Sequence, residues 1–156
     1  MKVEKDYEEL VRSFNKHKVR YCIIGAFAVA FHAKPRYTKD MDILVGADIE
    51  NGKKIIAALE EFGFGSLSLS AEDFAKSGKT IQLGYEPVRV DILTSIEGLD
   101  FEEAWKNKKA GAYGNEKAFF VGLSQLIKSK KLAARKRDIE DIDILLEAKK
   151  RKNKTK

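Results

Sequence analysis

Two aspartates interrupt an apolar segment of the chain and restrict how that segment can fold. Asp40 and Asp42 flank Met41 at the start of the apolar run 41–45. Side chains two residues apart on a β-strand leave the same face, roughly 6.5 to 7 Å apart along the backbone, so both carboxylates can converge on one cation. Asp91 is placed in the same way within the segment 88–93. Buried carboxylates are costly without a partner, and a shared metal ion would neutralise several of them at once.

The hydrophobic periodicity predicts helices and strands that mix without a strict βαβ repeat. The expected helices cover residues 5–17, 26–32, 52–62, 101–105 and two closing segments between 124 and about 149. The expected strands cover residues 21–24, 41–45, 64–69, 80–85, 88–93 and 118–121, with the segments 80–85 and 88–93 joined as a hairpin through Glu86-Pro87. This order predicts an α+β domain with a mixed central sheet, flanked by helices and closed by C-terminal helices.

A chain of 156 residues is long enough for one hydrophobic core. We expect residues 1–148 to form a single domain and residues 149–156 to form a basic, disordered tail. The tail contains no acid and accounts for much of the net charge of +6, so charge alone does not predict a nucleic-acid binder. No apolar run approaches the roughly 20 residues that span a bilayer, and we expect a cytoplasmic protein without a membrane partner. Cys22, the single cysteine, lies in an apolar run and is expected to be buried and without function.

The segment between the first strand and the acid pair contains three further candidates. Gly25 ends the strand and opens a helix, where free backbone amides suit a phosphate, although a plain packing turn has the same sequence. Arg36 matches phosphate oxygens with a forked donor or forms an ordinary ion pair. Thr38 can orient an aspartate through its hydroxyl. His32 is either a structural or capping residue at the helix end or a catalytic one.

The acids themselves also have two interpretations. Asp40 or Asp42 can cap a strand entrance or pair with Arg36 or Lys39, and an isolated Asp-x-Asp would not distinguish this from a metal site. Asp91 on a second strand and the upstream glycine favour the metal site. Ligands that are all oxygen favour Mg²⁺ or Mn²⁺ over zinc.

Taken together, these motifs resemble the nucleotidyltransferase superfamily of the polymerase beta type. The likeness is greatest to small bacterial and archaeal members related to abortive-infection toxins and aminoglycoside nucleotidyltransferases. It covers about residues 18–147 and rests on Gly25-Ala26-x-Ala28, His32, Arg36, Thr38, Asp40, Asp42 and Asp91, and on Lys130, Arg135, Asp138 and Asp141 near the C-terminus.

The resemblance implies a metal-dependent enzyme that moves a nucleoside monophosphate from a nucleoside triphosphate to a hydroxyl of a small molecule, protein or RNA. Asp40 and Asp42 would hold the Mg²⁺ or Mn²⁺ ions that bridge the phosphates, and Asp91 would complete the second metal site and help deprotonate the hydroxyl. The residues implied for nucleotide binding are Gly25, Ala26, Arg36, Thr38 and Lys130, although Lys130 can also be an ordinary solvated lysine.

One departure from the family pattern keeps a second function open. Ala26 stands where these proteins usually have glycine or serine, so the backbone amide is retained but a phosphate-binding hydroxyl is not. The alternative is a non-catalytic or weakly active binding module with this fold, such as one half of a toxin-antitoxin pair with a protein partner. A nonspecific nucleic-acid binder would rest on the basic tail alone.

Overall fold

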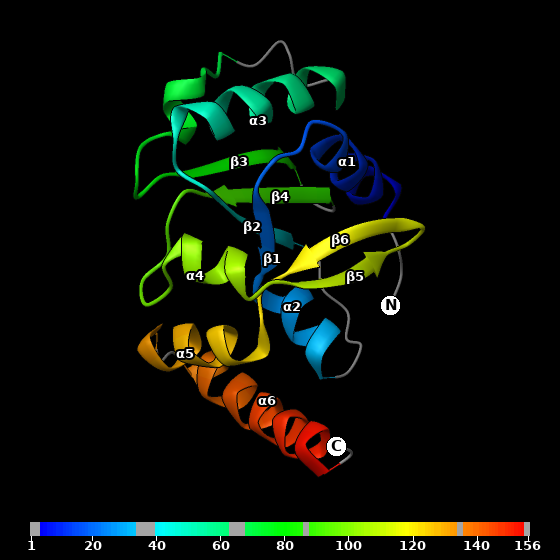
Figure 1. Cartoon of the computed structure of the whole chain (residues 1–156), viewed down its shortest axis with the longest axis vertical. Helices are drawn as coiled ribbons and strands as arrows, with labels where there is room; N and C mark the ends of the chain where they lie inside the picture. The colour runs from blue at the N-terminus through cyan, green and yellow to red at the C-terminus, as the bar shows by residue number, and fades with distance from the viewer. Residues whose placement is uncertain (1–3, 34–39, 63–67, 86–87, 134–135, 155–156) are drawn as a thin grey trace.

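The computed structural model describes residues 4–33, 40–62, 68–85, 88–133 and 136–154. Within these ranges the helices are α1 (Lys5–Lys16), α2 (Gly25–His32), α3 (Ile49–Phe62), α4 (Phe101–Lys106), α5 (Leu123–Ala133) and α6 (Lys136–Lys154), with a short 3-10 helix η1 (Ala71–Phe74). The strands are β1 (Tyr21–Ile24), β2 (Asp40–Val45), β3 (Thr80–Tyr85), β4 (Val88–Leu93), β5 (Lys109–Tyr113) and β6 (Glu116–Phe120). The predicted mixed α+β class is confirmed (Figure 1).

The strands form one mixed sheet in the order β3-β4-β2-β1-β6-β5. The central strand β2 runs antiparallel to β1 and parallel to β4. β3 pairs with β4 in antiparallel register, which confirms the predicted pairing of these two segments. The sheet therefore places the two acid-bearing strands, β2 and β4, next to each other near its centre.

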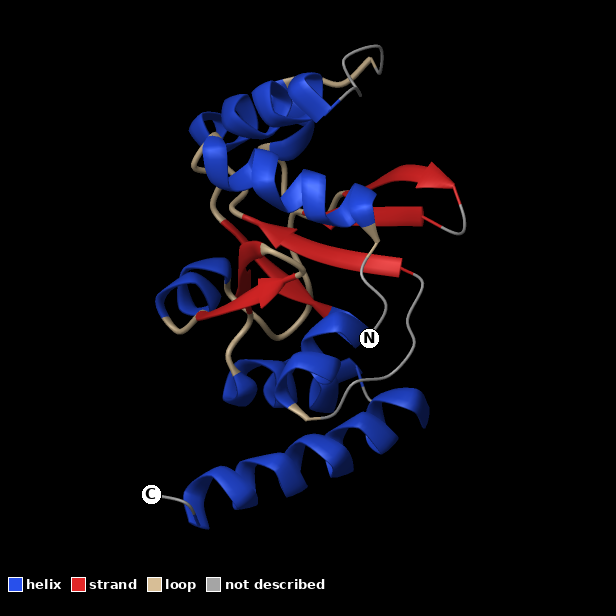
Figure 2. Cartoon of the chain, turned by 90° about the vertical axis from the view of Figure 1, so that its right-hand side faces the viewer, coloured by secondary structure: helices blue, strands red, loops and turns tan. Residues whose placement is uncertain are grey.

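Helices cover both faces of the sheet, and strand alternation decides which side chain enters which core. α1 and α3 pack on one face, whereas α2, α5 and α6 lie on the other (Figures 1 and 2). In β2, Ile43 and Val45 belong to the α1/α3 core, and Leu44 belongs to the core on the opposite face. Because Asp42 is two residues from Leu44, its side chain leaves the sheet on the α2/α5 face.

The structure differs from the sequence-based expectation at two segments. β5 was not expected, since its sequence contains one large apolar residue, Tyr113, and the strand lies mostly exposed at the sheet edge. Gly111 in β5 leaves room for the ring of Phe31, because a Cβ there would collide with that ring. The strand expected at 64–69 lies largely outside the described residues, and its described members, Ser68 and Leu69, are in no strand.

Two helices have boundaries that differ from those predicted from the sequence. α3 begins at Ile49 rather than at Gly52 because Asp48 caps it, accepting a hydrogen bond from the backbone N–H of Asn51 at 2.7 Å. α6 continues through Lys154, so residues 149–154 are helical where a disordered tail was expected. Lysine and arginine are good helix formers and suit a helix C-terminus, which explains the extension.

Two further observations complete the description of the fold. Cys22 is fully buried, and burial raises the pKa of its thiol to about 12, in keeping with a packing role. In the described part of the chain, every helix is too short or too polar to cross a bilayer.

Candidate active site

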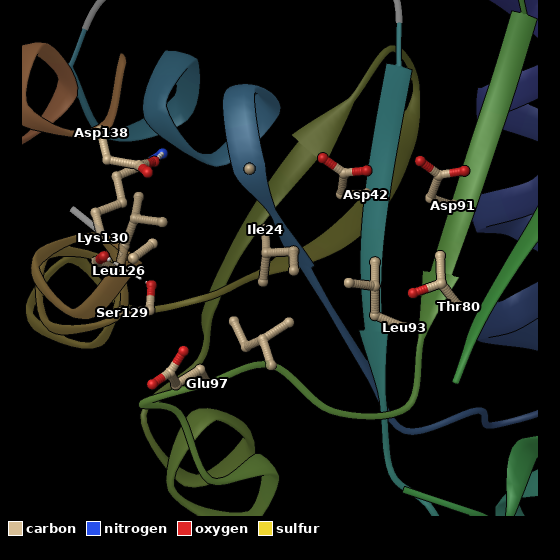
Figure 3. Close-up of a pocket in the computed structure, with 13 residues that line it drawn as sticks. Ile24, Asp42, Thr80, Asp91, Leu93, Glu97, Leu126, Ser129, Lys130 and Asp138 are labelled. Carbon is tan, nitrogen blue, oxygen red and sulfur yellow. Dashed lines mark hydrogen bonds and ion pairs between the residues drawn. The ribbon is translucent and has the colours of Figure 1, made fainter. Parts of the chain in front are cut away.

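A cleft of about 310 Å³ opens on the α2/α5 face of the sheet. Its walls come from the ends of β2, β3 and β4 on one side and from α5 and the start of α6 on the other (Figure 3). The lining residues that bear on chemistry are Gly25, Asp42, Asp91, Glu97, Lys130 and Asp138. Three segments far apart in the sequence thus meet at one opening.

The two acids of the cleft are direct neighbours across parallel strands. Asp42 of β2 is the register partner of Asp91 of β4, and both are partly buried. Figure 3 shows the two carboxylates side by side at the same height on their strands. The predicted meeting of Asp42 and Asp91 is therefore present in the structure.

Asp40 lies two residues before Asp42 on β2 and is next to Arg89 of β4. The two are register partners in β2 and β4, and strand alternation places both on the face that carries Asp42 and Asp91. One oxygen of Asp40, Oδ1, is buried and has no hydrogen-bond partner among the described residues. A buried carboxylate oxygen of this kind is the sort of atom that a bound cation would satisfy.

Arg89 belongs to this acid cluster and was not among the candidates named from the sequence. Its Nη2 and Nε donate hydrogen bonds to the two oxygens of Asp91, at 2.9 and 3.2 Å. These bonds raise the pKa of the Arg89 guanidinium above its ordinary value, and the nearby charges of Asp40 and Asp42 act in the same direction. The i, i+2 spacing of Arg89 and Asp91 places both side chains on one strand face, which is the sequence signal that could have named Arg89 as a candidate, although it does not fix the contact.

The backbone of Arg89 is anchored by α1. The hydroxyl of Tyr7 donates to the Arg89 carbonyl at 2.9 Å and accepts from the Arg89 N–H at 3.1 Å. Burial raises the pKa of Tyr7 to about 12, so the hydroxyl stays protonated and able to donate at neutral pH. The strand position of Arg89 is therefore fixed, although its side chain is one-third exposed, at 33%.

The donor set fits a hard divalent cation in part. Asp40 and Asp42 offer oxygen ligands from one strand face, and the unsatisfied Asp40 oxygen favours such a partner. Both oxygens of Asp91 already accept hydrogen bonds from Arg89. Among the described residues, no group of three or more His, Cys, Asp or Glu side chains is gathered closely enough to hold a metal as it stands.

Gly25 joins β1 to α2 immediately beside Asp42. Its φ of +69° is in the left-handed region that side chains other than glycine rarely adopt. A Cβ at this position would lie 2.5 Å from Oδ2 of Asp42. The N-cap residue of α2 is Ile24, whose side chain makes no capping hydrogen bond, and the first N–H groups of a helix suit an anion.

Gly25→Ala is expected to destabilise the fold and displace Asp42. The left-handed backbone should cost about 1–3 kcal/mol, and the contact with Asp42 adds to that cost. Gly78→Ala is the matched control, because Gly78 has a φ of +81° but nothing within 4 Å of an added Cβ. The free energies of unfolding in urea should show the larger loss for Gly25→Ala, and equal losses would mean that the Asp42 contact adds nothing.

Lys130 occupies the opposite wall of the cleft. Its ammonium lies 3.1 Å from Asp141 and 3.5 Å from Asp138, both of which are almost fully buried (Figure 3 shows Lys130 with Asp138). Lys130 is therefore not the solvated lysine that its basic surroundings allowed. It ties α5 to α6 and lines the cleft at the same time.

The remaining candidates are Arg36, Thr38, Arg135 and His32. Arg36 and Thr38 lie outside the described residues, as does Arg135. His32 is buried at the end of α2, where its Nε2 donates to the Val121 carbonyl at 2.6 Å. His32 is thus placed as a structural residue rather than as part of the cleft.

The stability of the protein should fall on mild acidification because of His32. Burial lowers its pKa, so between that lowered value and the usual pKa of about 6.5 the unfolded chain binds more protons than the folded one. The contribution of neutral His32 is present above about pH 6.5 and is lost as the pH falls. Urea unfolding at pH 7.5 and 5.0 should show a smaller pH-dependent loss for His32→Gln, which cannot titrate; an unchanged difference would assign the effect to other groups.

No protein-family model matches the chain, and no curated protein matches it by sequence. Solved structures do match. A nucleotidyltransferase-type protein from Thermotoga maritima aligns over 94% of this chain and 96% of its own, with a TM-score of 0.61 and 16% identity. The lincosamide antibiotic adenylyltransferase LnuA, solved with lincomycin bound, aligns over 91% of this chain and 95% of its own, with a TM-score of 0.55 and 20% identity.

A third structure extends this pattern. The protein ANT(2")-Ia, solved in complex with adenylyl-2"-tobramycin, aligns over 89% of this chain and 84% of its own, with a TM-score of 0.55 and 12% identity. At such low identity the likeness establishes the fold, and it does so over nearly the whole length of the chain. The resemblance read from the motifs is confirmed at that level: the chain has the fold of the nucleotidyltransferase superfamily.

Proposed function

We propose that this protein is a nucleotidyltransferase that moves a nucleoside monophosphate from a nucleoside triphosphate to a hydroxyl group of an acceptor. One observation carries the proposal. Asp42 and Asp91 are register partners that open into a cleft beside the Gly25 turn, with Lys130 on the facing wall. Acids, a helix N-terminus and a cation around one opening are what a phosphoryl-type transfer requires.

The residues of the chain have separable roles in this reaction. The first N–H groups of α2, at Gly25 and Ala26, would bind phosphate oxygens, and Arg36 and Thr38 follow in the sequence as further candidates. Asp91 would accept the proton of the acceptor hydroxyl. The new bond forms between that oxygen and the α-phosphorus, the bond from the α-phosphorus to the bridging oxygen breaks, and pyrophosphate leaves.

The acids also support a metal cofactor as part of the proposal. Asp40 and Asp42 would hold Mg²⁺ or Mn²⁺, with Asp91 as a further ligand, and such an ion would supply charge neutralisation at the phosphates. The ligand set is oxygen only, and the buried Oδ1 of Asp40 has no other partner among the described residues. Lys130 would add a positive charge on the opposite wall.

The neighbouring structures support an acceptor that carries a hydroxyl. One contains lincomycin and another contains adenylyl-2"-tobramycin. For this chain we propose the reaction class and leave the acceptor open among small molecules, proteins and RNA. Cytoplasmic localisation remains part of the same proposal, since nucleoside triphosphates are abundant there.

Intact-mass analysis tests this function directly. The full chain is incubated with Mg²⁺ and each of the four nucleoside triphosphates, together with pools of hydroxyl-bearing small molecules, RNA and protein. The expected result is a mass increase of one nucleoside monophosphate on an acceptor, with release of pyrophosphate, and its disappearance on addition of EDTA. Failure of all four triphosphates to bind in parallel calorimetry would refute the proposal.

A second candidate is a non-catalytic module that binds a protein partner, as in a toxin-antitoxin pair. Two observations favour it: Ala26 replaces the usual glycine or serine, and Arg89 occupies both oxygens of Asp91. This candidate predicts stoichiometric copurification of a partner and no nucleotidyl product. Product formation by the isolated chain would exclude it.

A further inference from the structure

The acid cluster of the cleft contains its own cation. Arg89 lies opposite Asp40 in the β2/β4 register and two residues before Asp91. Its forked contacts, 2.9 and 3.2 Å long, occupy both carboxylate oxygens of Asp91, whose side chain is only 13% exposed. Bidentate pairs of this kind are among the stronger charge-assisted hydrogen bonds, so this contact is a specific arrangement and not a loose surface pair.

A divalent ion that binds Asp91 has to compete with the Arg89 guanidinium for the same carboxylate. The guanidinium fork uses one lone pair on each oxygen of Asp91, so a metal ion would have to bind at a remaining lone pair, next to a positive charge. Two cations a few ångströms apart also repel each other strongly in a partly buried site. Tyr7 fixes the Arg89 backbone through two hydrogen bonds, so the strand stays in place and the exchange involves the side chain.

We propose that Arg89 competes with a divalent cation for Asp91, and that it thereby weakens metal binding in the absence of nucleotide. The inference rests on the proposed function, because it assigns the metal to the same acids. Arg89 acts in it as a positioning residue: it neutralises the cluster and holds Asp91 until a metal ion takes its place. The positive charge of Arg89 then stabilises the acid cluster when no metal ion is bound.

Binding of Mn²⁺ alone tests the competition. The electron paramagnetic resonance signal of free Mn²⁺ is titrated with the full chain, without nucleotide, for the wild type, Arg89→Gln and Arg12→Gln. Arg12 is the matched control, since it pairs with Glu116 at 2.6 Å on the surface and its loss changes the net charge equally. We expect Arg89→Gln to bind Mn²⁺ at least about ten-fold more tightly than the wild type, and Arg12→Gln to match the wild type.

A double-mutant cycle separates competition for Asp91 from simple removal of charge. If Arg89 acts by occupying Asp91, the gain from Arg89→Gln shrinks when Asp91 is already replaced in Asp91→Asn. A gain of the same size in both backgrounds would overturn the proposal, because it would reflect long-range repulsion alone. Arg89→Lys serves if Arg89→Gln does not fold, since lysine keeps the charge but lacks the fork, and it should give a smaller gain in the same direction.

The possible failures are distinguishable. If the wild type binds Mn²⁺ and Arg89→Gln binds it equally or more weakly, Arg89 does not compete and the inference fails while the proposed metal site stands. If neither the wild type nor any Arg89 variant binds Mn²⁺, the acids are not a metal site, and the metal part of the proposed function fails with the inference.

Discussion

Asp42→Asn is expected to lower the rate of nucleotidyl transfer by at least about 10³-fold while leaving the fold intact. The amide is nearly isosteric with the carboxylate, so packing beside Gly25 is preserved, but it removes one of the charges that face Asp91 in the cleft. The measurement is the rate of labelling of whichever acceptor the wild type modifies, with radiolabelled triphosphate and Mg²⁺. Circular dichroism and the urea midpoint establish that the variant is folded.

Asp143→Asn is the matched control for this experiment, because Asp143 is an exposed acid on α6 outside the cleft. It should retain wild-type activity. The same pair of variants also separates the two candidate functions. A binding module that merely keeps the fold would tolerate Asp42→Asn in its interaction with a partner, whereas loss of Mg²⁺-dependent triphosphate binding in Asp42→Asn alone would locate the chemistry at the acids.

The period-two rule explains why the centre of the fold and of the site could be predicted from the sequence. The apolar runs at β1, β2 and β4 are short and rich in residues that favour strands, so their existence follows from the sequence. The same alternation places Asp42 and Asp91 on one face. The pattern did not predict which strands are neighbours. Strand order and register depend on pairing between segments far apart in the sequence, here between residues 42 and 91.

What could not be predicted lies where local sequence carries little signal. β5 is an exposed edge strand held by pairing with β6, so its residues show no hydrophobic alternation. The bidentate contact of Arg89 with Asp91 depends on a side-chain rotamer, and the identity of the residue permits but does not fix that contact. At the C-terminus, a run of basic residues suggested disorder, whereas α6 continues through Lys154.

Lys130→Met is expected to destabilise the protein by about 3–5 kcal/mol, more than any surface substitution. Asp138 and Asp141 are each 1% exposed and share the Lys130 ammonium, which is itself only 11% exposed. Removing the ammonium takes one compensating charge away from two buried carboxylates, which then repel each other more strongly. The free energy of unfolding in urea measures the loss.

Two comparisons decide whether that loss comes from the buried carboxylates. Lys128→Met on the same helix removes an exposed lysine whose pair with Glu103 spans 3.7 Å, and it should cost less than about 1 kcal/mol. Adding Asp138→Asn and Asp141→Asn to Lys130→Met should recover part of the stability, because neutral amides tolerate burial better than carboxylates that have lost the Lys130 charge. If the triple variant is no more stable than Lys130→Met, the ammonium does not compensate the two acids. Lys130 would then be available to the triphosphate at no cost to the α5/α6 junction.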